Sequence, residues 1–199
     1  MKHTVKRLVP VLAGAALLAG CAVAPPAPED AFYRLGPTAE KVAGAPLLNG
    51  VVEVDRFAAS GSLANRALLY SEPGSNAISE YHYHFWIEAP PILLQSALVS
   101  YLRAAGVSDR VVTPEMRVTP DYTITGRVMR LETLHGDPVT GVAQFELSLR
   151  DEKTGKLVVL GEYGAEKASG KNGVQTDVSA IEKAVDEAFR AFVADIAKK

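Results

Sequence analysis

The only cysteine of this 199-residue chain stands directly after an apolar N-terminal segment, and this placement restricts what the rest of the chain can fold into. Three basic residues precede an uncharged run from Leu8 to Gly20, and Cys21 follows at once. A basic start, a short apolar run and small residues at its end are typical of a secretory signal peptide. The run is shorter than the ~20 residues that cross a bilayer as a helix. We therefore expect residues 1–20 to be an export signal, and a single cysteine excludes an intramolecular disulfide framework.

The residues Leu18-Ala19-Gly20-Cys21 resemble the box of a bacterial lipoprotein signal. This resemblance implies cleavage between Gly20 and Cys21, followed by acylation of the Cys21 thiol and of the new amine. Several acyl chains make such an anchor effectively permanent, because each buried CH₂ contributes ~0.8 kcal/mol. In the lipoproteins that this signal resembles, an Asp after the cysteine favours retention in the inner membrane. Here that residue is Ala22, which implies the periplasmic face of the outer membrane.

The segment after Cys21 is rich in proline and is expected to be a tether. Residues 22–30 read AVAPPAPED, and proline lacks an N–H donor and fixes φ, which excludes a helix or a central strand. At ~3.1 Å per residue such a segment reaches about 28 Å. We expect residues 21–31 to form the lipidated tether and residues 32–199 to form one periplasmic domain.

The composition fits a globular domain without a basic surface. Hydrophobic residues make up 48% of the chain and charged residues 22%, which suits a packed core. The chain holds 21 Lys and Arg against 23 Asp and Glu, and loss of the leader removes three bases and no acid. Since no run of Lys or Arg forms a basic stripe, nucleic acid and anionic headgroups are not expected partners of the surface as a whole.

Two groups of short strand patterns, each followed by a helix pattern, predict an α+β fold. The strand segments are rich in β-branched and aromatic residues and are bounded by turn-forming residues. They are 51–57, 67–70, 81–88, 121–131, 142–150 and 157–163, with a hairpin turn predicted at 152–155. The first helix is expected at about 90–105, between Pro90-Pro91 and Gly106. We expect a single domain in which two helices pack on one face of a mainly antiparallel sheet.

The second helix is predicted over about 177–197, with Asp177 or Ser179 as its N-cap. Apolar residues at three- and four-residue spacing, including Val185, Phe189 and Phe192, form the stripe that should face the core.

Motifs for catalysis and metal binding are missing from the sequence. There is no His-Glu-x-x-His, no Gly-x-Gly-x-x-Gly, no Walker loop and no Ser-x-x-Lys. His82 and His84 are two residues apart on a predicted strand and could share a face and ligate one metal. A zinc site would need a further ligand, and the only other histidine of the mature chain is His135. We therefore expect no catalytic residue, no metal and no cofactor.

The only tryptophan lies in the strand pattern 81–88, whose residues alternate between two faces. We expect the core face to hold Tyr81, Tyr83, Phe85 and Ile87. Trp86 would then lie on the opposite face, where a large amphipathic ring either packs under a loop or contacts a partner. Trp86 and Tyr33, which follows Phe32 at the start of the domain, are the candidates for a partner interface.

Several motifs together resemble the ABC-type transport auxiliary lipoprotein family, and the resemblance covers nearly the whole mature chain. They are the lipoprotein signal with its tether, Phe32-Tyr33-Arg34-Leu35, Val51-Val52-Glu53-Val54, Arg66-Ala67-Leu68-Leu69-Tyr70, and Tyr83-His84-Phe85-Trp86-Ile87-Glu88-Ala89-Pro90-Pro91 before an apolar helix. Members of this family accompany transporters built on MCE domains, which move phospholipids or other hydrophobic molecules between the inner and outer membranes. The resemblance implies a non-enzymatic component that docks with the MCE-domain protein.

Two other functions stay open at this point. A stand-alone lipoprotein could bind a hydrophobic ligand between helices and sheet, whereas a cell-envelope hydrolase would need motifs that the chain lacks. The resemblance also implies that the MCE partner is a hexameric ring. Weak contacts repeated around such an axis gain affinity, which favours a homo-oligomeric ring of this chain built through loops and sheet edges.

Overall fold

The protein is described by a computed structural model over residues 28–42, 44–170 and 173–199. The predicted leader, its cleavage site and Cys21 lie outside these residues. In the described part of the chain, no helix is both long and apolar enough to span a membrane.

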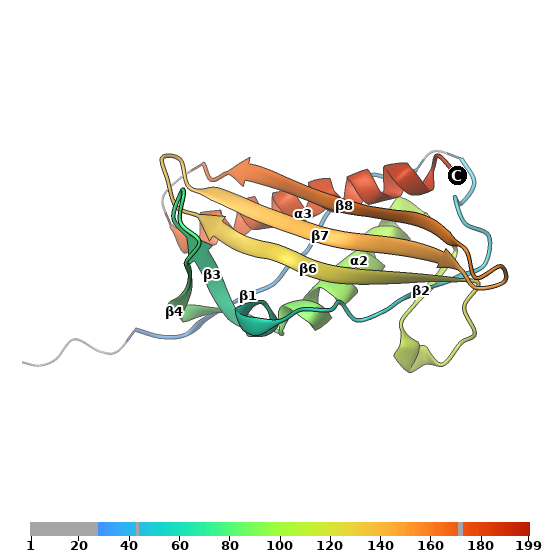
Figure 1. Cartoon of the computed structure of the whole chain (residues 1–199), viewed down its shortest axis with the longest axis horizontal. Helices are drawn as coiled ribbons and strands as arrows, with labels where there is room; N and C mark the ends of the chain where they lie inside the picture. Colours follow the sequence, from blue (N-terminus) through green and yellow to red (C-terminus); the bar gives the residue numbers. More distant parts are fainter. Residues whose placement is uncertain (1–27, 43, 171–172) are drawn as a thin grey trace, which may run out of the picture.

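Eight strands of the described chain form one sheet, and the strand β6 lies at its centre (Figure 1). The strands are β1 (Ala31–Tyr33), β2 (Val51–Val54), β3 (Ala67–Ser71), β4 (Ile78–Trp86), β5 (Arg110–Val112), β6 (Tyr122–Leu134), β7 (Thr140–Asp151) and β8 (Leu157–Ala168). Two short 3₁₀ helices, Gly61–Ala64 and Pro114–Met116, lie in the connections. The predicted turn at 152–155 joins β7 to β8 and includes Gly155 with a positive φ of 67°.

The sheet is mixed, so the expectation of a mainly antiparallel sheet was wrong. One edge of β6 pairs antiparallel with β7, which in turn pairs antiparallel with β8. The other edge of β6 is shared by two short parallel strands, with β2 beside its first residues and β3 beside its last. β5 and β1 add further parallel pairs at the ends of these branches. The parallel strands β2 and β3 have nearly continuous apolar sequences, which is typical of buried parallel strands, whereas β7 alternates as an antiparallel strand does.

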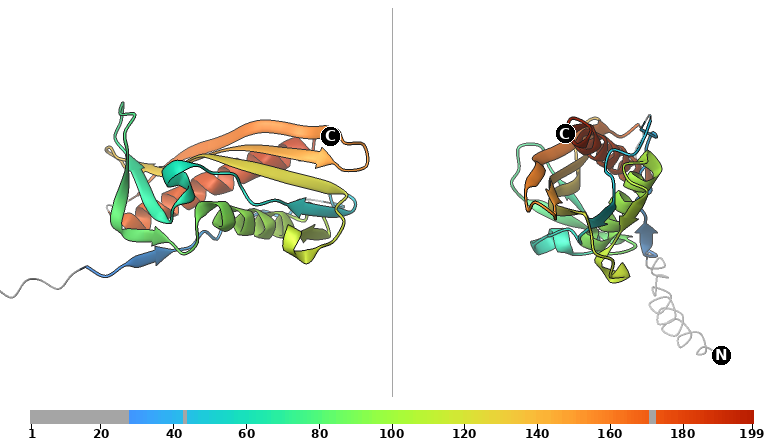
Figure 2. Two further views of the ribbon diagram at one scale, coloured as in Figure 1. Left: turned by 60° about the horizontal axis from the view of Figure 1, so that its bottom comes forward. Right: turned by 90° about the vertical axis from the view of Figure 1, so that its right-hand side faces the viewer.

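Two α-helices, α2 (Pro90–Ala105) and α3 (Val174–Ile196), cover one face of the sheet, as predicted (Figures 1 and 2). α2 begins at the two prolines and ends at Gly106, whose φ of 71° is a left-handed conformation that suits glycine. The buried Gln95 side chain of α2 donates a hydrogen bond of 2.9 Å to the carbonyl of Val54, which fixes the helix against β2.

α3 packs on β7 and β8. At one point the backbone of α3 lies almost in contact with the backbone of β7. A Cβ added to Gly141 of β7 would lie 2.2 Å from the amide nitrogen of Ile181 and 2.3 Å from the carbonyl carbon of Ala180. The lack of a side chain at Gly141 therefore allows this close approach. Further along α3, Val185, Phe189 and Phe192 are fully buried, which confirms the predicted core stripe.

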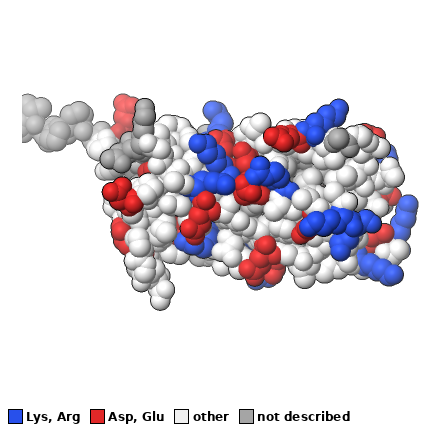
Figure 3. All heavy atoms as spheres, turned by 90° about the horizontal axis from the view of Figure 1, so that it is seen from above, with Lys and Arg blue, Asp and Glu red and all other residues white. Residues whose placement is uncertain are grey.

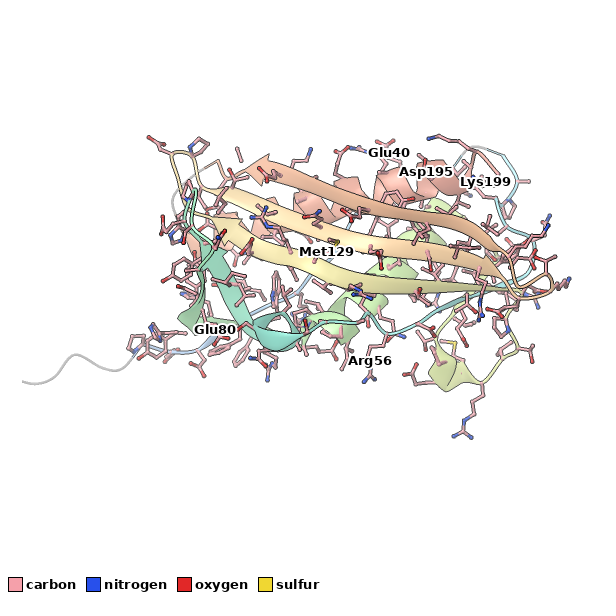
Figure 4. All side chains as sticks on the ribbon, in the orientation of Figure 1. Glu40, Arg56, Glu80, Met129, Asp195 and Lys199 are labelled. Atoms are coloured by element: carbon pink, nitrogen blue, oxygen red, sulfur yellow. The ribbon has the colours of Figure 1, made fainter. Side chains whose placement is uncertain are left out.

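The C-terminal end of α3 is tied to β8 through Tyr163, whose hydroxyl donates to Asp195 at 3.0 Å (Asp195 is labelled in Figure 4). Burial, together with the bond to Asp195 and its negative charge, raises the pKa of Tyr163 to about 12. In the unfolded chain the phenol ionises near its usual pKa of about 10. Ionisation therefore stabilises only the unfolded state between these two values.

We expect the free energy of unfolding to fall as the pH rises from about 10 to about 12, and to fall less in Tyr163→Phe, which has no phenol proton to lose. Other tyrosines with raised pKa values add to the slope in both proteins, so the difference between the two curves isolates Tyr163. Urea unfolding at pH 8 to pH 12, followed by circular dichroism, measures it. Parallel curves for the two proteins would contradict this assignment.

Candidate functional site

The chain enters the domain at one end of the sheet, where β1 pairs with the last residues of β4. The register places Ala31 beside His84 and Tyr33 beside Trp86, in parallel orientation. Figure 2 shows β1, in blue, at this end of the domain. Both sequence-predicted interface residues, Tyr33 and Trp86, therefore lie on neighbouring strands next to the tether.

Trp86 is a core residue. Its side chain is only 1% exposed and is the largest fully buried one of the described chain. Its backbone is also held, because its N–H donates to the carbonyl of Arg66 and its own carbonyl accepts a 3.0 Å bond from the Arg66 guanidinium. Of the two alternatives for Trp86, the structure thus supports packing, and a partner cannot reach the indole without unfolding this end.

The predicted faces of β4 were reversed at its C-terminal end. Trp86 points into the core, whereas Tyr83 and Ile87, expected in the core, are 41% and 39% exposed. Between Ala67 and Leu69 of β3 the pairing with β4 slips, so that four residues of β4 lie opposite one residue of β3. A period of two shows which residues share a face but not which face is inside, and such an irregularity changes the face part-way along a strand.

Tyr33 is half-buried, and its hydroxyl bonds to Nδ1 of His84 at 2.8 Å. Burial raises the pKa of the Tyr33 phenol above its usual value. The bond joins residues 51 positions apart in the chain and fastens β1 to β4. Tyr33 is therefore held in place rather than free to reorient toward a partner.

A second cluster of polar and aromatic side chains surrounds Tyr81 of β4. The Tyr81 hydroxyl lies 3.0 Å from Nε2 of His135 and 3.2 Å from the hydroxyl of Thr133, and Nδ1 of His135 lies 2.8 Å from a carboxylate oxygen of Glu72. The His135 ring stacks on Tyr70 with centroids 4.5 Å apart. Burial, partly offset by the bond to Thr133, raises the pKa of Tyr81. The cluster ties the β3–β4 hairpin to the end of β6.

The three mature histidines do not converge. His82 is exposed, His84 bonds to Tyr33, and His135 bonds to Tyr81 and Glu72. Within residues 28–42, 44–170 and 173–199, no three His, Cys, Asp or Glu side chains are grouped so that they could hold a metal ion. The histidine bonds described above go to tyrosine and glutamate and not to a serine hydroxyl.

The outer face of the sheet, opposite the helices, is polar. A hollow of about 370 Å³ lies on this face, and its lining includes Arg130, Gln144, Glu162, Gly164 and Glu166. On the side of the molecule seen from above the view of Figure 1, charged side chains of both signs are likewise mixed (Figure 3). A polar, open hollow suits an apolar ligand poorly, and the space between helices and sheet is filled by side chains with almost no exposure.

Comparisons with known proteins agree with this architecture. The fold is similar to that in the crystal structure of protein XCC0632 from Xanthomonas campestris, with a TM-score of 0.72 and 14% identity. The match covers 82% of this chain and 92% of that chain. A second crystal structure, of an uncharacterized protein, has a TM-score of 0.63 and 17% identity. This match covers 86% of this chain and 98% of that chain. These identities show a shared fold and nothing further. A search of curated proteins finds no match.

The match that concerns function is to a family model described as the ABC-type transport auxiliary lipoprotein component. It extends over residues 33–197, from the β1 tyrosine to the end of α3, and so includes nearly every described element. The resemblance to this family is confirmed. The chain belongs to the family of ABC-type transport auxiliary lipoprotein components.

Proposed function

We propose that this protein is a periplasmic accessory component of an ABC transport system with an MCE-domain protein, anchored through Cys21 in the outer membrane. The observation that carries the proposal is the family match over residues 33–197, because an auxiliary component of ABC-type transport needs a transporter partner. The lipoprotein-like signal and Ala22 support the anchor and its membrane. The cargo would be a phospholipid or another hydrophobic molecule.

The shape of the domain supports docking at the end away from the tether. The sheet is long, and the tether enters at the β1–β4 end, whereas the β5–β6 and β7–β8 connections lie at the other (Figure 1). Met116 and Val118 in the first connection and Leu157 at the start of β8 are each more than 40% exposed. Apolar side chains on loops that face away from the anchoring membrane are suited to contact a partner that comes from the inner membrane.

No catalytic step belongs to this function. The side-chain bonds of His84 and His135 go to tyrosine and glutamate, and the hollow on the sheet is lined by charges that include the Arg130–Glu166 ion pair at 3.6 Å. The cargo would travel through the partner, and this domain would connect the partner to the outer membrane.

A genetic test separates an accessory from an independent ligand carrier. If the protein acts only through the MCE system, a strain that lacks both genes is expected to be no more sensitive to membrane-damaging compounds than a strain that lacks the MCE gene alone. Additive sensitivity of the double deletion would contradict the proposal. Complementation by each gene is the control for polar effects.

We further propose that the lipoprotein forms a homo-oligomeric ring. β8 presents a 12-residue edge that pairs only with β7, and β1 and β5 end the other branches of the sheet. Open edges on opposite sides of one subunit permit head-to-tail contacts that close around an axis.

Light scattering of the detergent-solubilised, acylated lipoprotein is expected to show a mass several times that of one chain, rising further with the MCE partner. Replacing the buried-face residues of α3 would not be informative, whereas Leu160→Lys beside the β8 edge is expected to lower the mass. A single-chain mass at high concentration, with and without partner, would rule out the ring.

A further inference from the structure

One face of the β1–β4 pair exposes apolar side chains at the tether end of the domain. Phe32 is 51% exposed, and the parallel register places it beside Phe85, with ring centroids 5.8 Å apart. Tyr83 and Ile87 alternate with the buried Trp86 and so share the face of Phe85. We name these four residues, Phe32, Tyr83, Phe85 and Ile87, the tether-end patch.

The positively charged side chain of Arg66 lies against the patch. The guanidinium carbon of Arg66 lies 5.1 Å above the centroid of the Phe32 ring, and its Nε donates to the carbonyl of Trp86 at 3.0 Å. Arg66 is exposed and takes part in none of the salt bridges found among the described residues. Its charge is thus fixed at the edge of an apolar surface without an acidic partner there.

The chain length between the anchor and the patch limits what can lie opposite the patch. Cys21 precedes Ala31 by ten residues, which reach at most about 36 Å when fully extended. β1 begins directly after this segment, and Phe32 is its second residue. The patch is therefore the part of the domain's apolar surface that stays nearest to the acylated cysteine, whereas the loops near Met116 and Leu157 lie at the opposite end.

We infer that the tether-end patch rests on the phospholipid surface into which Cys21 is anchored. Phe, Tyr and Ile side chains bury their apolar bodies at the level of the headgroups, where Tyr keeps its hydroxyl in water. Arg66 extends from the same surface and reaches phosphate oxygens while its stem stays on the patch. The acidic residues Glu29, Asp30 and Glu88 near the patch disfavour strongly anionic lipid, so a zwitterionic headgroup is the matching surface.

This inference rests on the lipid anchor of the proposed function and adds an orientation to it. With the patch on the membrane, the domain does not swing freely on its tether, and its distal loops point into the periplasm. The effective concentration of those loops for a partner that spans the periplasm is then higher than for a freely rotating domain.

A dye attached at one position of the patch tests the contact. Cys21 is acylated in the mature lipoprotein, so a cysteine introduced by Tyr83→Cys is the only thiol free to react with an environment-sensitive fluorophore. The matched control carries the dye at Met129→Cys on β6, where the Met129 side chain is 37% exposed. Both proteins are reconstituted in phosphatidylcholine–phosphatidylethanolamine vesicles that contain phospholipids brominated in their acyl chains.

We expect the brominated lipid to quench the dye at position 83 and to leave the dye at position 129 almost unchanged. Adding Phe32→Ser and Ile87→Ser to the Tyr83→Cys protein is expected to remove most of the quenching, while flotation with the vesicles is retained through the anchor. Equal quenching at both positions, or none at position 83 in floating protein, would overturn the inference. If position 83 is shielded only when light scattering shows oligomers, a second copy covers the patch, and the membrane contact is wrong.

Failure of the anchor gives a different result. A Tyr83→Cys protein that does not float with vesicles, although its leader is cleaved, would contradict both the proposed anchor and the contact that depends on it.

Discussion

Replacing Cys21 by serine is expected to abolish acylation completely and to leave the protein unprocessed or outside the outer membrane. The thiol is the group that the lipoprotein signal presents for acylation, and the chain has no other cysteine that could take its place. The described residues also hold no membrane-spanning helix that could replace the anchor. Metabolic labelling with a fatty-acid analogue, followed by membrane fractionation, measures both effects.

The neighbouring substitution Ala22→Ser is the matched control, because it changes the same segment by one hydroxyl and keeps the thiol. We expect it to be labelled and localised like the natural protein. Fatty-acid label on the Cys21→Ser chain would show that the lipid is attached elsewhere and would remove the basis for a Cys21 anchor.

Replacing Phe189 by alanine is expected to destabilise the domain by about 3–5 kcal/mol, the usual cost of deleting a buried aromatic ring. Phe189 of α3 is 0% exposed, and its ring lies 5.8 Å from that of Phe145 on β7 and 5.6 Å from that of Tyr101 on α2. The substitution therefore leaves a cavity where both helices meet the sheet. Such a loss is a large part of the ~5–15 kcal/mol that stabilises a typical domain.

Urea unfolding followed by the fluorescence of the single tryptophan measures this loss, since Trp86 is buried in the same core. Leu160→Ala is the control, because its side chain is 60% exposed and its loss is expected to change stability by no more than about 0.5 kcal/mol. A change below about 1 kcal/mol for Phe189→Ala would contradict the packing described for the three elements.

The helices were the most predictable part of the fold. Pro90-Pro91 and Gly106 mark α2 because proline suits the first helical turn and glycine the left-handed stop, and both bounds agree with the structure. α3 begins earlier than predicted, at Val174 after Gly173, and Asp177 lies within its first turn. A carboxylate in a first turn is favoured by the helix dipole as well as by a capping position, so the residue type alone does not fix the start.

Strand pairing was predictable only for neighbours along the chain. β7 and β8 are joined by a short turn and must run antiparallel, whereas β2 and β3 both pair with β6 after long intervening segments. Which distant strand fills each half of the β6 edge is set by contacts between segments far apart in the chain, such as the bond from Gln95 of α2 to Val54 of β2. Local sequence patterns contain no record of that choice.

The same limit applies to the site residues: local motifs identified some of them, but contacts between distant positions could not be predicted. Tyr33 was identified from a motif at the start of the domain, but its bond to His84 joins positions 51 apart and could not be read from spacing. The tether-end patch was missed because Phe85 and Ile87 have the composition of core residues. The slip in the β3–β4 register places Trp86 inside instead, and no sequence signal marks that slip.

The central claim is that the end of the domain away from the anchor docks with an MCE-domain protein. A photo-activated cross-linking amino acid at Met116, which is 52% exposed in the distal loop, tests it in intact cells, with the same group at Met129 on β6 as the control. The account predicts an ultraviolet-dependent product at position 116 that contains the MCE-domain protein, identified by mass spectrometry, and little of it at position 129. A position-116 product that lacks the MCE-domain protein, or the absence of any product while both proteins are present in the envelope, would contradict it.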